Sequence, residues 1–188
     1  MKLVRNISFG AVMLLYLWFP YSMIIDQQHI LKNGEVFRFR PQPVDPYDAF
    51  RGRYITLQFV EQTMDFPNAY ETFLRNDQIY VMLEKDSLGY YNFSDPSIEK
   101  PSDQNYIKTN VLYTTDNRVT VKIPENLSRY YLNEKLAPLA EKKYRELTRN
   151  TESDEVNVYL DARVLKGEVL IEELYFEDKP VSEYLKSQ

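Results

Sequence analysis

The clearest fold signal in the chain is the stretch over residues 155–176, which reads EVNVYLDARVLKGEVLIEELYF. In its first half, residues 155–164, apolar side chains alternate with polar or aromatic ones, and this period of two is typical of a half-buried β-strand. Lys166 and Gly167 form a turn signal, and a second apolar run follows over 168–176. The stretch therefore predicts an antiparallel hairpin.

Working outward from this hairpin, the same alternation recurs along most of the chain. Glu172 and Glu173 interrupt the hairpin's second strand, and we interpret them as a bulge or an edge feature. In residues 53–60, Ile55, Leu57 and Phe59 are expected to face the core, with Tyr54 on the opposite face. Further strands are predicted over 34–39, 78–84, 89–93, 106–113 and 118–123.

Helical spacing replaces the alternation in two places. Apolar residues recur three and four apart over 138–149, and more briefly over 68–75. The proline-rich segment 41–46 predicts an extended connector, and 96–105 reads as a loop. Together these patterns predict an α+β fold: a mainly antiparallel β domain of about eight strands with one or two helices.

The N-terminus carries a different signal. Residues 7–25 are uncharged and mostly apolar, and about 20 such residues are what a helix needs to cross a hydrocarbon core. This run predicts a single N-terminal transmembrane helix that acts as a signal-anchor. The expected organisation is a cytoplasmic N-terminus over 1–6, an anchor over 7–25, a neck over 26–33 and an extracytoplasmic β-rich domain over 34–188.

A cleaved signal peptide and a buried core helix are the alternatives for this run. A basic start followed by an apolar segment is common to anchors and signal peptides. Residues 21–26, however, read YSMIID and lack a small-x-small cleavage site. Nothing else in the chain is patterned to cover a helix that is apolar on all sides, so the anchor is favoured over both alternatives.

Charge predicts the orientation of the anchor and excludes one class of partner. Lys2 and Arg5 precede the run and Asp26 follows it, which places the N-terminus in the cytoplasm and the domain in the periplasm or outside the cell. Of 23 Lys and Arg residues, 21 lie beyond the run, against 28 Asp and Glu, a net charge of -7. A domain with this net negative charge lacks the basic surface that nucleic-acid binding requires.

Composition also limits the chemistry. The chain has no cysteine and one histidine, His29, which excludes disulfides, iron–sulfur clusters, thiol nucleophiles and multi-histidine metal sites. We interpret His29 as a neck residue and not as part of a catalytic triad. No phosphate-binding glycine loop is present. We therefore predict no catalytic residue, no cofactor and no metal. Calcium binding through oxygen ligands stays open as an alternative, but Asp65 and residues 151–155 lack the spacing of a dedicated calcium loop.

A resemblance to a known family rests on residues 43–59, which read PVDPYDAFRGRYITLQF. This segment resembles the signature of the bacterial membrane-anchored family named for its Gly-Asp-Tyr-x-x-Leu-x-Tyr motif. An aromatic pair before Glu134, the helix after it and the closing hairpin are also similar. The candidate motif or interaction residues are Pro43, Asp45, Pro46, Asp48, Arg51, Gly52, Arg53, Tyr54, Leu57, Phe59, Tyr131 and Glu134.

The chain departs from the family pattern at two motif positions. Arg53 stands where the family has Asp, and Phe59 stands where it has Tyr. The resemblance implies a single-pass anchored domain, often encoded beside a multi-span membrane protein, with no established activity. Taken by themselves, the polar residues of 43–53 are explained either by turn chemistry, which we favour, or by a polar site for a ligand or partner.

These observations predict a membrane-anchored, extracytoplasmic accessory or interaction protein of the bacterial cell envelope, with a polytopic membrane protein as its expected partner. Two alternatives stay open. One is a hydrolase that uses acidic residues in a tyrosine-lined groove, since the chain has 16 tyrosines. The other is a non-catalytic relative of the signal-peptidase β fold, in which Val44 and Asp45 stand where the nucleophile segment would lie.

Overall fold

The computed structural model describes residues 2–42, 54–57, 59, 62–102, 105–133, 135–149 and 158–186. Within these ranges the protein consists of antiparallel strands in three sheets, together with five helices. The predicted α+β class with a mainly antiparallel sheet is confirmed. Eleven strands and five helices are described, against the expected eight strands and two or three helices including the anchor.

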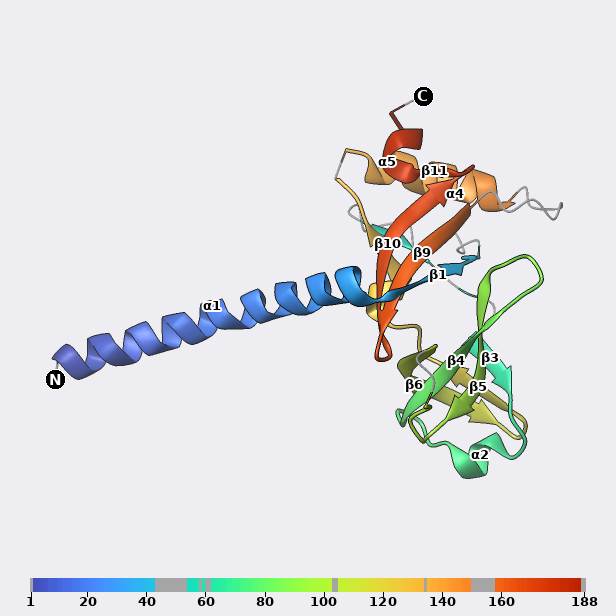
Figure 1. Ribbon diagram of the computed structural model, residues 1–188, viewed down its shortest axis with the longest axis horizontal. Helices are drawn as coiled ribbons and strands as arrows, with labels where there is room; N and C mark the ends of the chain where they lie inside the picture. The colour runs from blue at the N-terminus through green and yellow to red at the C-terminus, as the bar shows by residue number, and fades with distance from the viewer. Residues whose placement is uncertain are drawn as a thin grey trace.

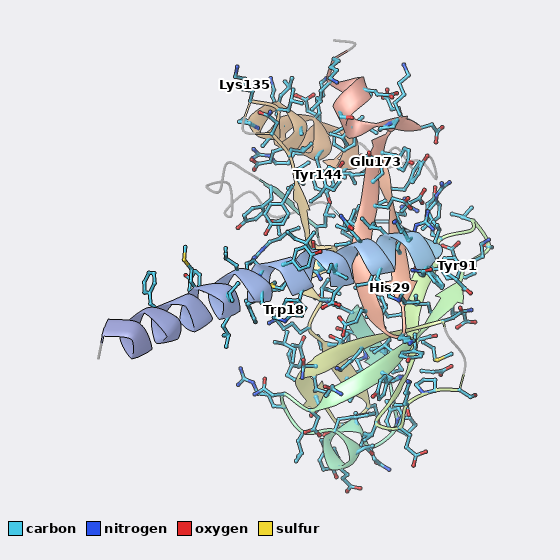
Figure 2. All side chains as sticks on the ribbon, turned by 60° about the vertical axis from the view of Figure 1, so that its left-hand side comes forward. Trp18, His29, Tyr91, Lys135, Tyr144 and Glu173 are labelled. Carbon is cyan, nitrogen blue, oxygen red and sulfur yellow. The ribbon has the colours of Figure 1, made fainter. Side chains whose placement is uncertain are left out.

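One long helix, α1 (Lys2–Asn33), precedes the sheets and projects away from them (Figure 1). It continues through Pro20 and through the stretch expected to be a neck. Figure 2 shows Trp18 on the projecting part of this helix and His29 on its part beside the domain. No helix among the described residues is both long and apolar enough to be identified as a membrane span.

The first sheet contains the hairpin predicted over 155–176 and lies where α1 enters the domain. Its order is β1-β9-β10-β11, so β9 is flanked on both sides. The bulge expected at Glu172 and Glu173 is confirmed, because the β9–β10 register shifts between Ile171 and Glu173. The strands are β1 (Glu35–Phe39), β9 (Val158–Leu165), β10 (Glu168–Phe176) and β11 (Lys179–Pro180).

The second sheet forms the lower lobe in Figure 1 and consists of two hairpins, whose four strands were predicted, and the additional strand β3. Its order is β3-β7-β6-β4-β5, and the two outermost strands, β3 and β5, also approach each other, so the sheet curls. The strands are β3 (Thr63–Asp65), β4 (Gln78–Lys85), β5 (Tyr91–Ser97), β6 (Tyr106–Thr115) and β7 (Arg118–Val121).

A two-stranded sheet and four helices complete the described fold. Helix α4 occupies the range predicted from its periodicity, and ion pairs such as Glu141–Arg145 at 3.3 Å run along its outer side. The two strands are β2 (Tyr54–Thr56) and β8 (Arg129–Tyr131), and the helices are α2 (Ala69–Thr72), α3 (Glu125–Ser128), α4 (Ala137–Arg149) and α5 (Val181–Tyr184).

A single hydrophobic cluster joins the three sheets. The turn of the β9–β10 hairpin reaches the second sheet, where the Lys108 amide donates to the Gly167 carbonyl at 2.9 Å. A Cβ on Gly167 would lie 2.7 Å from the Tyr106 ring, so only glycine allows this approach. At a second point, the Tyr91 ring of β5 in the second sheet packs edge-on against the Phe37 ring of β1 in the first, with ring centroids 4.7 Å apart. The two larger sheets are therefore locked at two points.

Three predictions were partly wrong: two in the length of an element and one in its burial. The helix expected over 68–75 ends at Thr72, because Phe73 takes an extended backbone and buries its ring against Phe66 at 4.8 Å, which leaves Leu74 exposed. The loop expected over 96–105 begins later, since β5 continues through Pro96. Proline is tolerated there because β5 is an edge strand that needs no outward hydrogen bonds.

The third error concerns β9, which was expected to be half-buried. Its outward residues Tyr159 and Asp161 are also buried, because side chains from β1, β10 and the β4–β5 turn cover them. The expected strand over 53–60 is described only at its centre, and there Ile55, Leu57 and Phe59 are buried as predicted while Tyr54 lies on the other face.

Candidate functional site

The fold brings together the two segments that carry the family resemblance. Strand β2 lies in the first of them and β8 lies just before Glu134 in the second, and the two pair antiparallel. In this register Tyr54 is opposite Tyr131 and Ile55 is opposite Tyr130. Segments more than 70 residues apart in sequence thus form one ribbon.

The outer side of this ribbon is aromatic and basic. The Tyr54 and Tyr131 ring centroids are 5.5 Å apart, and the Arg129 guanidinium lies 5.2 Å from the centre of the Tyr54 ring. Tyr131 is 65% exposed. We call Tyr54, Arg129 and Tyr131 the aromatic face. The two ring planes are inclined by 58°. A tilted ring pair with a cation over one ring suits planar, aromatic or extended polar partners better than it suits bond-breaking chemistry.

The inner side of the ribbon is held against the first sheet. Ile55 is buried in the core, and the Tyr130 hydroxyl donates to the Glu173 carboxylate at the bulge of β10. Burial, reinforced by this hydrogen bond, raises the pKa of Tyr130 well above its ordinary value. The Leu174 amide also donates to Glu173, at 3.2 Å. The bulge therefore aims a carboxylate at β8.

Two of the predicted motif residues belong to the core. Leu57 is 1% exposed, and its amide donates to the Ser128 carbonyl at 2.8 Å, which extends the β2–β8 connection by one bond. Phe59 is 4% exposed and packs against Phe39 and Phe93, with centroids 6.1 Å and 6.3 Å away. These residues hold the aromatic face in place from behind and offer no surface to a ligand.

Helix α4 makes a hydrogen bond to Gln42, the residue just before the family-like segment 43–59. The buried Tyr144 hydroxyl donates to the Gln42 carbonyl, and burial raises the pKa of Tyr144 well above its ordinary value. Figure 2 shows Tyr144 and Glu173 on elements of the upper lobe. The remaining predicted site residues lie outside the described ranges: Pro43, Asp45, Pro46, Asp48, Arg51, Gly52, Arg53 and Glu134.

A second polar cluster, which the sequence pattern did not predict, lies on the outer face of the first sheet. Arg38 on β1 makes a bidentate pair with Asp161 on β9, with contacts of 2.8 Å and 2.9 Å. The Arg38 guanidinium lies 4.3 Å from the centre of the Tyr159 ring, and Tyr159 stacks on Tyr175 with centroids 4.8 Å apart. The polar positions of β9 signalled an outward face, but nothing local to either strand showed that Arg38 would lie opposite Asp161.

This cluster is closely packed. Asp161 is 9% and Tyr159 is 6% exposed, and burial together with a hydrogen bond to Asp178 raises the pKa of Tyr159 to about 12. Since Arg38 is already paired with a carboxylate, the cluster serves to fix β1 on β9 and leaves little charge for a ligand.

Several carboxylates of the described residues form ion pairs with arginine, among them Asp65, Asp161 and Glu172. No group of three His, Cys, Asp or Glu side chains that could hold a metal ion occurs in the ranges that the structure describes. An open hollow between the β6–β7 turn and the segment before α2 is lined by Asp65 and Asp116, and Asp65 is 3.0 Å from Arg118. An open hollow with a paired carboxylate differs from the enclosed cleft that a glycosidase-like hydrolase requires.

Comparison with known proteins identifies the family of the chain. The family model described as GDYXXLXY protein matches residues 16–174, which include both strands of the ribbon. The chain belongs to the GDYXXLXY family. No curated protein and no solved structure matches it.

As a GDYXXLXY protein, the chain presents three motif positions in a clear structural setting. The motif Tyr, Tyr54, lies on the aromatic face, and the motif Leu, Leu57, is buried behind it. The last position of the motif, a Tyr in the family name, is Phe59 here and is surrounded by phenylalanine rings. A tyrosine hydroxyl at this position would need a hydrogen-bond partner in the core, and Phe59 removes that requirement.

Proposed function

We propose that this GDYXXLXY protein is a single-pass, membrane-anchored accessory protein of the bacterial cell envelope, whose extracytoplasmic domain acts by binding a polytopic membrane protein. The observation that carries the proposal is the aromatic face, which the fold builds from both family segments and leaves open to solvent at Tyr131. Catalysis has no comparable support among the described residues.

The proposed anchor is supported by the surface of α1. Large apolar side chains at positions 9 to 25, among them Leu14, Tyr16 and Trp18, are 45% to 81% exposed. Because the exposed positions run without a break from 12 to 19, they lie on all sides of the helix. This part of α1 projects away from the other described elements (Figure 1). Exposed apolar area of this extent is stable in a hydrocarbon environment and costs free energy in water.

The proposed orientation rests on charge. Lys2 and Arg5 lie at the start of α1, and the first acidic residue, Asp26, comes after the apolar run. The positive-inside bias then leaves the N-terminus in the cytoplasm and the sheets outside it. Protease treatment of spheroplasts should digest the domain while leaving a small N-terminal fragment in the membrane; a soluble mature protein beginning near Asp26 would refute the anchor.

The binding role is supported by the composition of the aromatic face. Tyrosine and arginine, together with tryptophan, are enriched among the residues that contribute most binding energy at the centre of protein interfaces. Tyr131 and Arg129 lie on one side of a ribbon whose other side is fixed to the core by Ile55 and Tyr130. A rigid backing of this kind lowers the cost of ordering the face on binding.

The experiment is photocrosslinking in the native membrane followed by mass spectrometry. A photoreactive phenylalanine analogue at Tyr131 should capture an integral-membrane protein, and the same analogue at Tyr113, an exposed tyrosine of β6 in the second sheet, is the matched control. Capture from Tyr131 and not from Tyr113 supports the proposal. Equal capture from both positions, or no membrane protein from either, overturns it.

A further inference from the structure

The connection between α1 and the domain is unusually short. Helical backbone continues to Asn33, a single residue follows, and β1 begins at Glu35. No glycine or proline lies between Tyr21 and Asn33. The Asn33 side chain also donates to the His29 carbonyl at 3.0 Å, one turn earlier. The helix therefore enters the sheet without a linker.

The single connecting residue, Gly34, is buried in a space that admits no side chain. Its amide donates to the Ile30 carbonyl at 2.8 Å and completes the last turn of α1. A Cβ on Gly34 would lie 2.6 Å from the Ile30 oxygen and 3.1 Å from both the Arg163 Cβ and the Val164 oxygen. The end of the helix is thus pressed against β9.

Arg163 and Glu172 lock this junction. The Arg163 Nη1 donates to the Gly34 carbonyl at 3.1 Å, and its Nε and Nη2 donate to the Glu172 carboxylate at 2.7 Å and 2.9 Å. Glu172 is the extra residue of the β10 bulge, since the register with β9 shifts between Ile171 and Glu173. The bulge therefore supplies the carboxylate that orients the arginine on the end of α1.

We propose that α1 and the domain form one rigid lever, locked at Gly34 by Arg163 and Glu172, which presents the aromatic face to the membrane partner at a fixed rotation about the α1 axis. The lever rests on the proposed function for its partner, but its rigidity does not. Residues 26–33 extend the helix by about 12 Å at 1.5 Å per residue, which sets the height of the domain above the apolar run.

The rigidity is tested by distance measurements on the full-length chain in lipid nanodiscs. Because the chain has no native cysteine, two introduced cysteines report alone: Gln28→Cys on α1 and Lys142→Cys on the exposed side of α4. Spin labels at these positions should give one narrow distance distribution. Arg163→Ala should broaden it, whereas Arg118→Ala, which removes the ion pair with Asp65 in the second sheet, should not.

Two results of this measurement would overturn the lever. One is a broad distribution in the otherwise unchanged chain, which would mean that the junction is not rigid. The other is an Arg163→Ala distribution as narrow as that of Arg118→Ala, which would mean that Arg163 is not the lock. The second variant Glu172→Gln, which keeps the side-chain shape and removes its charge, should broaden the distribution in the same direction as Arg163→Ala.

The fixed rotation is tested by alanine insertions between Asp26 and Gln27, with crosslinking from position 131 as the readout. Two alanines turn the domain by about 200° and raise it by about 3 Å, whereas four turn it by about 40° and raise it by about 6 Å. The two-residue insertion should lose the crosslink and the four-residue insertion should retain part of it. The reverse order, or equal capture from both, overturns a fixed rotation.

These results separate the lever from the proposed function. If the unmodified chain captures no membrane protein while the spin-label distances are narrow and depend on Arg163, the proposed partner is wrong and the rigid junction stands. If capture succeeds but the distances are broad, the partner stands and the lever is wrong.

Discussion

Tyr130 on β8 donates its hydroxyl hydrogen to the Glu173 carboxylate on β10 and so ties the strand that carries the aromatic face to the first sheet. The two residues are 43 positions apart, and the β10 bulge determines that Glu173 points at β8. The family-like ribbon is therefore held by the same irregularity that supplies Glu172 to the end of α1. One bulge serves two junctions.

Removing this hydrogen bond should weaken the attachment of β8. Tyr130→Phe leaves the Glu173 carboxylate without its hydroxyl partner, and we expect a loss of about 1–3 kcal/mol in the free energy of unfolding. Tyr131→Phe, the neighbouring and exposed position, should change it by less than about 0.5 kcal/mol. Urea denaturation of both variants measures the difference. Equal stability of the two variants would contradict a structural role for the Tyr130–Glu173 pair.

The register of β2 is tested by a pair of leucine truncations. Leu57 is 1% exposed and Leu74 is 66% exposed. Leu57→Ala should therefore cost about 2–5 kcal/mol, because it removes buried area and leaves a cavity. Leu74→Ala makes the same chemical change at the surface and should cost less than about 0.5 kcal/mol. Chemical denaturation compares them, and a silent Leu57→Ala would show that the inward face of β2 is misassigned.

The contact between the two larger sheets predicts a difference between two glycines. Gly167 and Gly89 both have positive φ angles, +88° and +93°, so alanine is strained at either site. At Gly167 the added Cβ would also lie 2.7 Å from the Tyr106 ring, whereas at Gly89 the nearest atom, the Lys85 Cε, is 3.6 Å away. Gly167→Ala should exceed Gly89→Ala in cost by about 1–3 kcal/mol in thermal melts. Equal costs would mean that backbone strain alone decides both.

Stability should fall in alkali, because the fold keeps several tyrosines neutral. Burial raises the folded-state pKa of Tyr144. The stability that its neutral hydroxyl contributes to the fold is therefore fully present below the unfolded pKa of about 10. This stability is lost as pH rises above that value toward the folded-state pKa. Tyr144→Phe should reduce the slope of melting temperature against pH above pH 10. A slope unaffected by Tyr144→Phe would contradict this assignment.

Local pattern determined the elements of this protein well. The alternation over 155–176 identified the β9–β10 hairpin, its turn at Lys166 and Gly167 and its bulge, and helical spacing identified α4. These features depend on side-chain periodicity and turn chemistry within a few residues, which are written in the adjacent sequence. The short elements β3, β8 and α5 were not predicted, because three or four residues carry too few positions to show a period.

Only the tertiary structure decided which elements meet. The pairing of Tyr54 with Tyr131, the ion pair of Arg38 with Asp161 and the capture of the Gly34 carbonyl by Arg163 all join residues more than 70 positions apart. Strand alternation predicts which side of a strand is buried, but it is the same for every possible neighbour, so it cannot select a partner strand or a register across the sheet. That selection comes from packing one shared core, and for this reason the aromatic face and the junction at Gly34 emerged from the fold and not from the motif.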